Sequence, residues 1–122
     1  MMASILTVDD SISMRQAIKI ALSGEGHSVV EAGNGAEGLV KADAGDFALI
    51  ITDLNMPVMD GLTMIQQLRA KPAHAGVPIL FVTTESDATI KAQAKAAGAT
   101  GWITKPFDPD QLVRIVAKVL AS

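Results

Sequence analysis

Apolar and polar residues follow one another along this chain in two different rhythms. Short runs rich in apolar, mostly β-branched residues predict strands at 4–8, 27–32, 47–53, 77–82 and 101–104. Between and after these runs, apolar residues recur at helical spacing, which predicts helices after residue 11, over 36–44, after residue 61, over 87–97 and from residue 109. Strand and helix therefore alternate five times, a pattern typical of an α/β fold with a doubly wound five-stranded parallel sheet flanked by five helices.

Two of the predicted helices carry details that a structure can check. Either Ser11 or Ser13 has the side chain needed to cap the first helix. In the third helix, Leu62, Ile65 and Leu68 form the expected buried stripe.

Polar residues stand where the predicted strands end. The run Leu49-Ile50-Ile51 is typical of a central strand covered on both faces, and the strand stops at Asp53. Open α/β sheets bind their ligands beyond the carboxyl ends of the strands. Four of the five strands end in polar residues, which should therefore meet at one edge of the sheet: Asp9, Asp10, Asp53, Thr83, Thr84 and Lys105.

The residue types at this edge predict magnesium and phosphate chemistry. Carboxylates held close together repel one another unless a cation neutralises them, and hard oxygen ligands favour Mg²⁺ over zinc. The Lys105 ammonium and a Thr83 hydroxyl are suited to bind phosphoryl oxygens. A carboxylate can also serve as a phosphoryl acceptor, and Asp53 is the candidate because it stands alone on the central strand, whereas Asp9 and Asp10 come as a pair.

Composition narrows the class of protein. A chain of 122 residues that is 49% hydrophobic and 19% charged is expected to form one domain spanning 1–122, with no output domain after its last helical pattern. The net charge of −3, with scattered Lys and Arg, argues against a nucleic-acid partner. The absence of cysteine, of a leader pattern and of a long apolar run predicts a cytoplasmic protein without membrane contact. No glycine-rich nucleotide motif is present.

Four segments together resemble the receiver domain of two-component response regulators, and within it the single-domain chemotaxis type, CheY-like. They are Thr7-Val8-Asp9-Asp10-Ser11, the run from Asp53 to Gly61 (DLNMPVMDG), Thr83-Thr84-Glu85-Ser86, and the run from Gly98 to Phe107 (GATGWITKPF). The match extends over about residues 4–120. The resemblance implies a flavodoxin-like fold with strand order 2-1-3-4-5.

The resemblance also implies a set of roles. Asp53 would accept a phosphoryl group from a kinase phosphohistidine, and Lys105, in a cis peptide bond to Pro106, would contact the phosphoryl oxygen. Thr83 would move toward the new phosphate. Asp9 or Asp10, or both, would hold Mg²⁺ together with Asp53 and the backbone carbonyl of Asn55.

Switch and tuning positions come from the same resemblance. Trp102 stands where the family usually has Tyr or Phe, so it is either the aromatic partner of Thr83 in switching or a packing residue. Asn55 and Glu85 match positions that tune hydrolysis of the aspartyl phosphate, with simple loop polarity as the alternative, and Thr84 is grouped with them. Lys91 and Lys95 are predicted to share an exposed face of the fourth helix.

The function expected is a phosphorylation-activated signalling switch that is no enzyme beyond its own phosphorylation and dephosphorylation. Its expected partners are a CheA-like sensor histidine kinase and, on the output side, a flagellar motor switch protein or a phosphatase, and it is expected to be a monomer. One alternative is a phosphate sink or phosphorelay intermediate. A more distant one is a phosphohydrolase with an aspartyl nucleophile, which would need a second acid two residues after Asp53, where this chain has Asn55.

Overall fold

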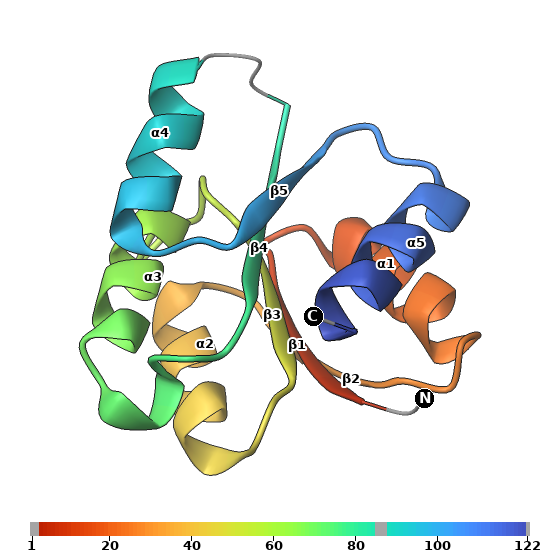
Figure 1. The fold of residues 1–122 in the computed structure, drawn as a ribbon, viewed down its shortest axis with the longest axis horizontal. Coiled ribbons are helices and arrows are strands. Elements are labelled where there is room, and N and C mark those ends of the chain that lie inside the picture. Colours follow the sequence, from red (N-terminus) through yellow and green to blue (C-terminus); the bar gives the residue numbers. More distant parts are fainter. Residues whose placement is uncertain (1–2, 85–87, 122) are drawn as a thin grey trace.

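A computed structural model describes residues 3–84 and 88–121. In this part of the chain a five-stranded parallel sheet runs through the middle of the molecule in the order β2-β1-β3-β4-β5, with α1 and α5 on one face and α2, α3 and α4 on the other (Figure 1). The elements are β1 (Ser4–Val8), α1 (Ile12–Ser23), β2 (Ser28–Ala32), α2 (Gly35–Ala44), β3 (Leu49–Asp53), α3 (Gly61–Arg69), the 3₁₀ turn η1 (Pro72–His74), β4 (Ile79–Thr83), α4 (Ala88–Ala97), β5 (Gly101–Thr104) and α5 (Pro109–Leu120). The predicted fold class and strand order are confirmed.

Two apolar cores hold the sheet in place, one on each face. Because side chains alternate along a strand, β3 sends Ile50 toward α2, α3 and α4 and sends Leu49 and Ile51 toward α1 and α5. β4 divides its side chains in the same way. All five residues of β3 are buried, as are all five of β4, so the strand that ends at Asp53 is firmly held in the middle of the sheet.

Several boundaries differ from the predicted ones. β3 begins at Leu49 and not at residue 47, since Ala48 is exposed and precedes the sheet. β4 runs to Thr83, which therefore belongs to the strand and not to the loop. In α3, Met64 is fully buried beside Ile65 and Leu68, whereas Leu62 lies only partly buried at the edge of the stripe. The predicted start of the fourth helix, at residue 87, lies outside the described residues.

Side-chain caps fix where the helices begin after the strands. Ser11, not Ser13, caps α1, and its hydroxyl accepts a hydrogen bond from the Met14 N–H. Asp60 caps α3 by accepting from the Thr63 N–H at 2.8 Å. The Ser11 cap fixes where the chain passes from the β1 loop into α1, and the Asp60 cap fixes where it enters α3. No helix in the described ranges is long and apolar enough to cross a membrane.

Gly61 allows α3 to start directly against the end of β3. A Cβ added at Gly61 would lie 2.1 Å from the Asp53 carbonyl oxygen and 2.9 Å from Leu54 Cα, both of them backbone atoms. The Gly61 N–H donates to the Leu54 carbonyl at 2.9 Å, which closes the loop that carries Asn55. The absence of a side chain here is therefore a packing requirement.

We predict that Gly61→Ala lowers the free energy of unfolding by about 2 kcal/mol. Alanine is intrinsically the better helix former, so a loss of stability would report the clash with the β3 backbone. The matched control is Gly76→Ala, because a Cβ at Gly76 would meet nothing within 4 Å. Equal midpoints for the two variants in urea unfolding would contradict the prediction.

Candidate functional site

Asp53 is held firmly at the carboxyl end of β3. Asp53 is 8% exposed, and its Oδ1 accepts a hydrogen bond from the Leu54 N–H at 2.8 Å. Its Oδ2 lies 3.5 Å from the Nζ of Lys105, which follows β5. One carboxylate oxygen is thus occupied by the backbone, and the other faces an ammonium group.

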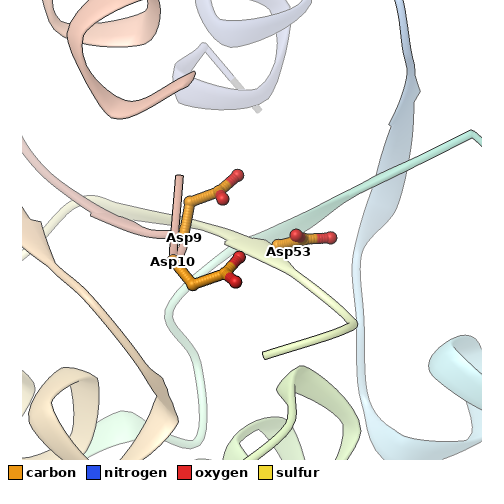
Figure 2. A group of neighbouring side chains, drawn as sticks. All are labelled: Asp9, Asp10 and Asp53. Atoms are coloured by element: carbon orange, nitrogen blue, oxygen red, sulfur yellow. The ribbon is translucent and has the colours of Figure 1, made fainter. Parts of the chain in front are cut away.

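Asp9 and Asp10 follow β1 and bring two more carboxylates to the same place (Figure 2). Carboxylate oxygens of these two residues and of Asp53 all lie within 4.8 Å of one another. The two neighbours are not equivalent, because Asp9 is buried with 1% exposure whereas Asp10 is exposed. Asp9 Oδ1 accepts from the Ser11 N–H at 2.9 Å, so the cap of α1 and the acidic site share one loop.

The environment of Asp9 favours binding of a cation. Burial is the largest influence and raises the pKa of its carboxyl, the Ser11 N–H lowers it, and the charge of Asp53 raises it again. The buried Asp9 Oδ2 has no hydrogen-bond donor among the described residues. Three carboxylates and the single Lys105 ammonium sum to a charge of −2 when all are ionised, which a divalent ion would neutralise. The residues present therefore fit Mg²⁺, whose preferred ligands are carboxylate and carbonyl oxygens.

Thr83 and Lys105 meet this site from the next two strands. Thr83 ends β4 with 6% exposure, and its carbonyl accepts from the Lys105 N–H at 2.9 Å. The Lys105-Pro106 peptide bond is cis, as the family resemblance implies. Thr84 is exposed just beyond the strand. The predicted constellation of acids, hydroxyl and ammonium thus assembles at one edge of the sheet.

Trp102 lies on β5, some distance along the strand from this cluster. Its side chain is 39% exposed, and its ring centroid lies 6.2 Å from that of the buried Phe81. Lys91 Nζ lies 4.7 Å from the Trp102 ring centroid, a cation–π contact that leaves Lys91 only partly exposed. The prediction that Lys91 and Lys95 share an exposed face therefore holds for Lys95, which is exposed, and only in part for Lys91.

Two predicted residues, Asn55 and Glu85, and one residue that was not predicted, Arg15, remain to be placed. Asn55 is exposed in the loop after β3. Glu85 lies outside the described residues. Arg15 was not predicted from the sequence, and its Nη1 donates to the Asp9 carbonyl at 2.6 Å. The available signal was an arginine in the first turns of the helix that follows the acidic pair, with Glu31 near the end of the neighbouring strand.

Comparison with known proteins agrees with this geometry. The response regulator receiver domain family matches residues 5–117. Chemotaxis protein CheY1 of Helicobacter pylori is 40% identical over 120 residues, which cover 97% of each chain. The CheY homolog of Campylobacter jejuni is 39% identical, covering 97% of this chain and 92% of its own. The solved structure of chemotaxis response regulator CheY4 of Vibrio cholerae has 43% identity and a TM-score of 0.93, covering 98% of this chain and 99% of its own.

We predict that Asp9→Asn stabilises the Mg²⁺-free protein by about 1 kcal/mol near neutral pH, as relief of a strained site often does. The amide keeps an oxygen for the Ser11 N–H and removes a buried negative charge from beside Asp53. Urea unfolding in the presence of a chelator measures the difference. A less stable Asn variant would contradict the proposed repulsion.

The sign of the pH dependence gives a second check on the same variant. Because the pKa of Asp9 is raised above its ordinary 3.8, the folded protein keeps a proton that the unfolded chain has released. The free energy of unfolding therefore falls as pH rises from 3.8 through the folded pKa. The stability advantage of the Asn variant should widen over that interval, and a constant difference would show that Asp9 is not the responsible group.

Proposed function

This chain belongs to the response regulator receiver domain family, of the CheY type found in chemotaxis, and we propose that it is a switch turned on by phosphorylation of Asp53. The donor is a phosphohistidine on a CheA-like sensor kinase. The observation that carries the proposal is the single Asp53 oxygen that faces Lys105 within a cluster of three carboxylates. The three acids favour a divalent cation, and the lysine supplies a positive charge for a phosphoryl oxygen.

The geometry supports a direct transfer to Asp53 Oδ2. In this step a bond forms between Oδ2 and phosphorus while the phosphorus–nitrogen bond to the kinase histidine breaks. Lys105, 3.5 Å from Oδ2, is placed to balance negative charge on the transferred group. Asp9, Asp10, Asp53 and the Asn55 carbonyl would hold Mg²⁺, which supplies charge neutralisation at the phosphoryl oxygens and helps to align them.

Thr83 and Lys105 pass the conformational change that follows phosphorylation on to the rest of the domain. Their backbones are hydrogen-bonded to each other. A phosphoryl group shifts a two-state equilibrium only by interacting differently with the two states, and these two side chains supply that difference. Trp102 lies near Phe81 and on the same strand as Thr104, which pairs in register with Thr83, and its exposure then changes. The face formed by α4, β5 and α5 presents this change to a flagellar motor switch protein or a phosphatase. We place the protein in the cytoplasm as a monomer.

We predict that incubation with acetyl phosphate and Mg²⁺ adds one phosphoryl group to the protein, and that Asp53→Asn abolishes the gain. Asn has no carboxylate to act as the nucleophile, while its amide keeps the shape of the side chain. Intact mass measured with and without Mg²⁺ gives the result. Asp10→Asn is the informative companion, because it keeps the acceptor and should slow the reaction without preventing it.

Three outcomes of the mass experiment have different meanings. A gain that persists in Asp53→Asn would move the acceptor to another residue. A gain that is indifferent to Mg²⁺ would remove the proposed role of the acid cluster. Phosphorylation of the native protein without binding of a motor-switch peptide would favour a phosphate sink or phosphorelay intermediate.

We also predict that phosphorylation shifts the fluorescence emission of Trp102 to shorter wavelength. Trp102 is the single tryptophan of the chain and is 39% exposed, so inward movement would remove water from the indole. Thr83→Ala should still gain the phosphoryl group yet lose the shift. A shift retained in Thr83→Ala would uncouple the two residues, and an unchanged native spectrum would leave Trp102 a packing residue only.

A further inference from the structure

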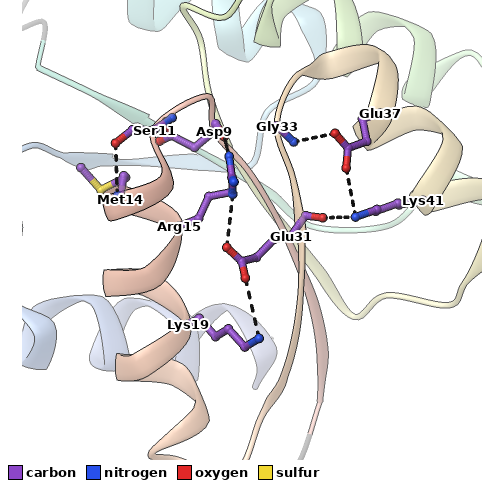
Figure 3. Close-up of polar contacts among 9 residues, drawn as sticks. All are labelled: Asp9, Ser11, Met14, Arg15, Lys19, Glu31, Gly33, Glu37 and Lys41. Carbon is purple, nitrogen blue, oxygen red and sulfur yellow. Dashed lines mark hydrogen bonds and ion pairs between the residues drawn. The ribbon is translucent and has the colours of Figure 1, made fainter.

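Arg15, on α1, ties the loop that carries the acidic pair to strand β2. Its Nη1 donates to the Asp9 carbonyl at 2.6 Å, and its Nε donates to Glu31 Oε1 at 3.2 Å (Figure 3). The Arg15 side chain is only 17% exposed. We propose that Arg15 is a positioning residue of the acidic site: it holds the backbone of Asp9 through the Asp9 carbonyl. The proposal rests on the Mg²⁺-dependent function proposed above.

The bond to the Asp9 carbonyl completes the fixation of that residue. The Asp9 N–H donates to the Ala32 carbonyl at 3.0 Å, and Oδ1 accepts from the Ser11 N–H at 2.9 Å. With the carbonyl held by Arg15, the remaining polar atom is the buried Oδ2, which has no donor in the described part of the chain. The carbonyl belongs to the peptide that joins Asp9 to Asp10, so holding it restricts the backbone from which both carboxylates extend.

The arginine is itself oriented by a small network of charges. Glu31 accepts from Arg15 and lies 3.7 Å from Lys19 Nζ. Lys41 donates to the Glu31 carbonyl and forms an ion pair of 3.1 Å with Glu37. A planar guanidinium can bind the Glu31 carboxylate and the Asp9 carbonyl at the same time, whereas a lysine offers a single point of charge. The arrangement therefore uses a property specific to arginine.

Charge and position make opposite predictions for the removal of Arg15. A cation close to a Mg²⁺ site repels the metal, so Coulomb's law alone predicts tighter binding when Arg15 is replaced by a neutral residue. Loss of the bond to the Asp9 carbonyl predicts weaker binding, because the carboxylates are then less well placed. Residues that orient metal ligands typically change metal affinity by about 10-fold or more when replaced.

The experiment is a Mg²⁺ titration, measured by calorimetry, of the native protein and of Arg15→Met, Arg15→Lys and Lys19→Met. Lys19→Met is the matched control, since it removes one positive charge from the same network without touching Asp9. We expect Arg15→Met to weaken binding about 10-fold. Arg15→Lys should fall between it and the native protein, and Lys19→Met should bind as tightly as the native protein or more tightly. Unchanged or tighter binding by Arg15→Met overturns the proposal.

A second measurement needs no metal. The Ser11 amide is bonded to Asp9 Oδ1, so its hydrogen exchange in Mg²⁺-free protein reports the order of the loop. We expect faster exchange in Arg15→Met than in Lys19→Met, with the exchange of the β3 amides unchanged as evidence that the fold is intact. Equal Ser11 exchange in the two variants overturns the role of Arg15. Failure of the native protein to bind Mg²⁺ would instead overturn the proposed function, so the two failures are distinguishable.

Discussion

The site depends on one constraint: three carboxylates that repel one another are held together at the edge of the sheet. Oxygens of Asp9, Asp10 and Asp53 lie within 4.8 Å of one another, although the chain could lower its energy by separating them. They stay together because β1 and β3 are adjacent strands with buried side chains on both faces, and Val8 pairs in register with Thr52. The stability of the two apolar cores thus maintains an unfavourable arrangement of charge at the sheet edge, as is common at functional sites.

Two basic residues approach this cluster, and they act in different ways. Lys105 faces the Asp53 carboxylate from the end of β5, where it offsets part of the negative charge. Arg15 contacts the backbone carbonyl of Asp9 and forms an ion pair with Glu31, so the Glu31 carboxylate offsets much of its positive charge. The cluster therefore keeps a net negative charge while its backbone is held in place. That combination suits a site that must bind a divalent cation and also admit a phosphoryl group.

The fold and the meeting of the acidic residues with Lys105 at one edge of the sheet could be predicted because they depend on local patterns. Apolar runs gave the strands, and the polar residues that end them had to meet at one edge of a parallel sheet. The difference between buried Asp9 and exposed Asp10 could not be predicted, because it depends on how the β1–α1 loop turns against Ser11. Three contacts join different elements, and no spacing in the sequence encodes them. They are the contact of Arg15 with the Asp9 carbonyl, the cation–π pair of Lys91 with Trp102 and the hydrogen bond between His74 and Asp43 at 2.8 Å.

The strands that carry the site differ in how tightly they are held, and this difference suits a switch. β3 is buried along its whole length and fixes Asp53, whereas β5 is an edge strand that pairs with β4 and buries only Ile103. Lys105 and Trp102 both lie on or next to this edge strand, and Lys105 is bonded through its backbone to Thr83. A phosphoryl group on Asp53 would be attached to the buried strand β3 and would lie close to β5, the strand that is more easily displaced. Movement is therefore expected at β5, where it changes the exposed surface, because displacing β3 would disrupt both apolar cores.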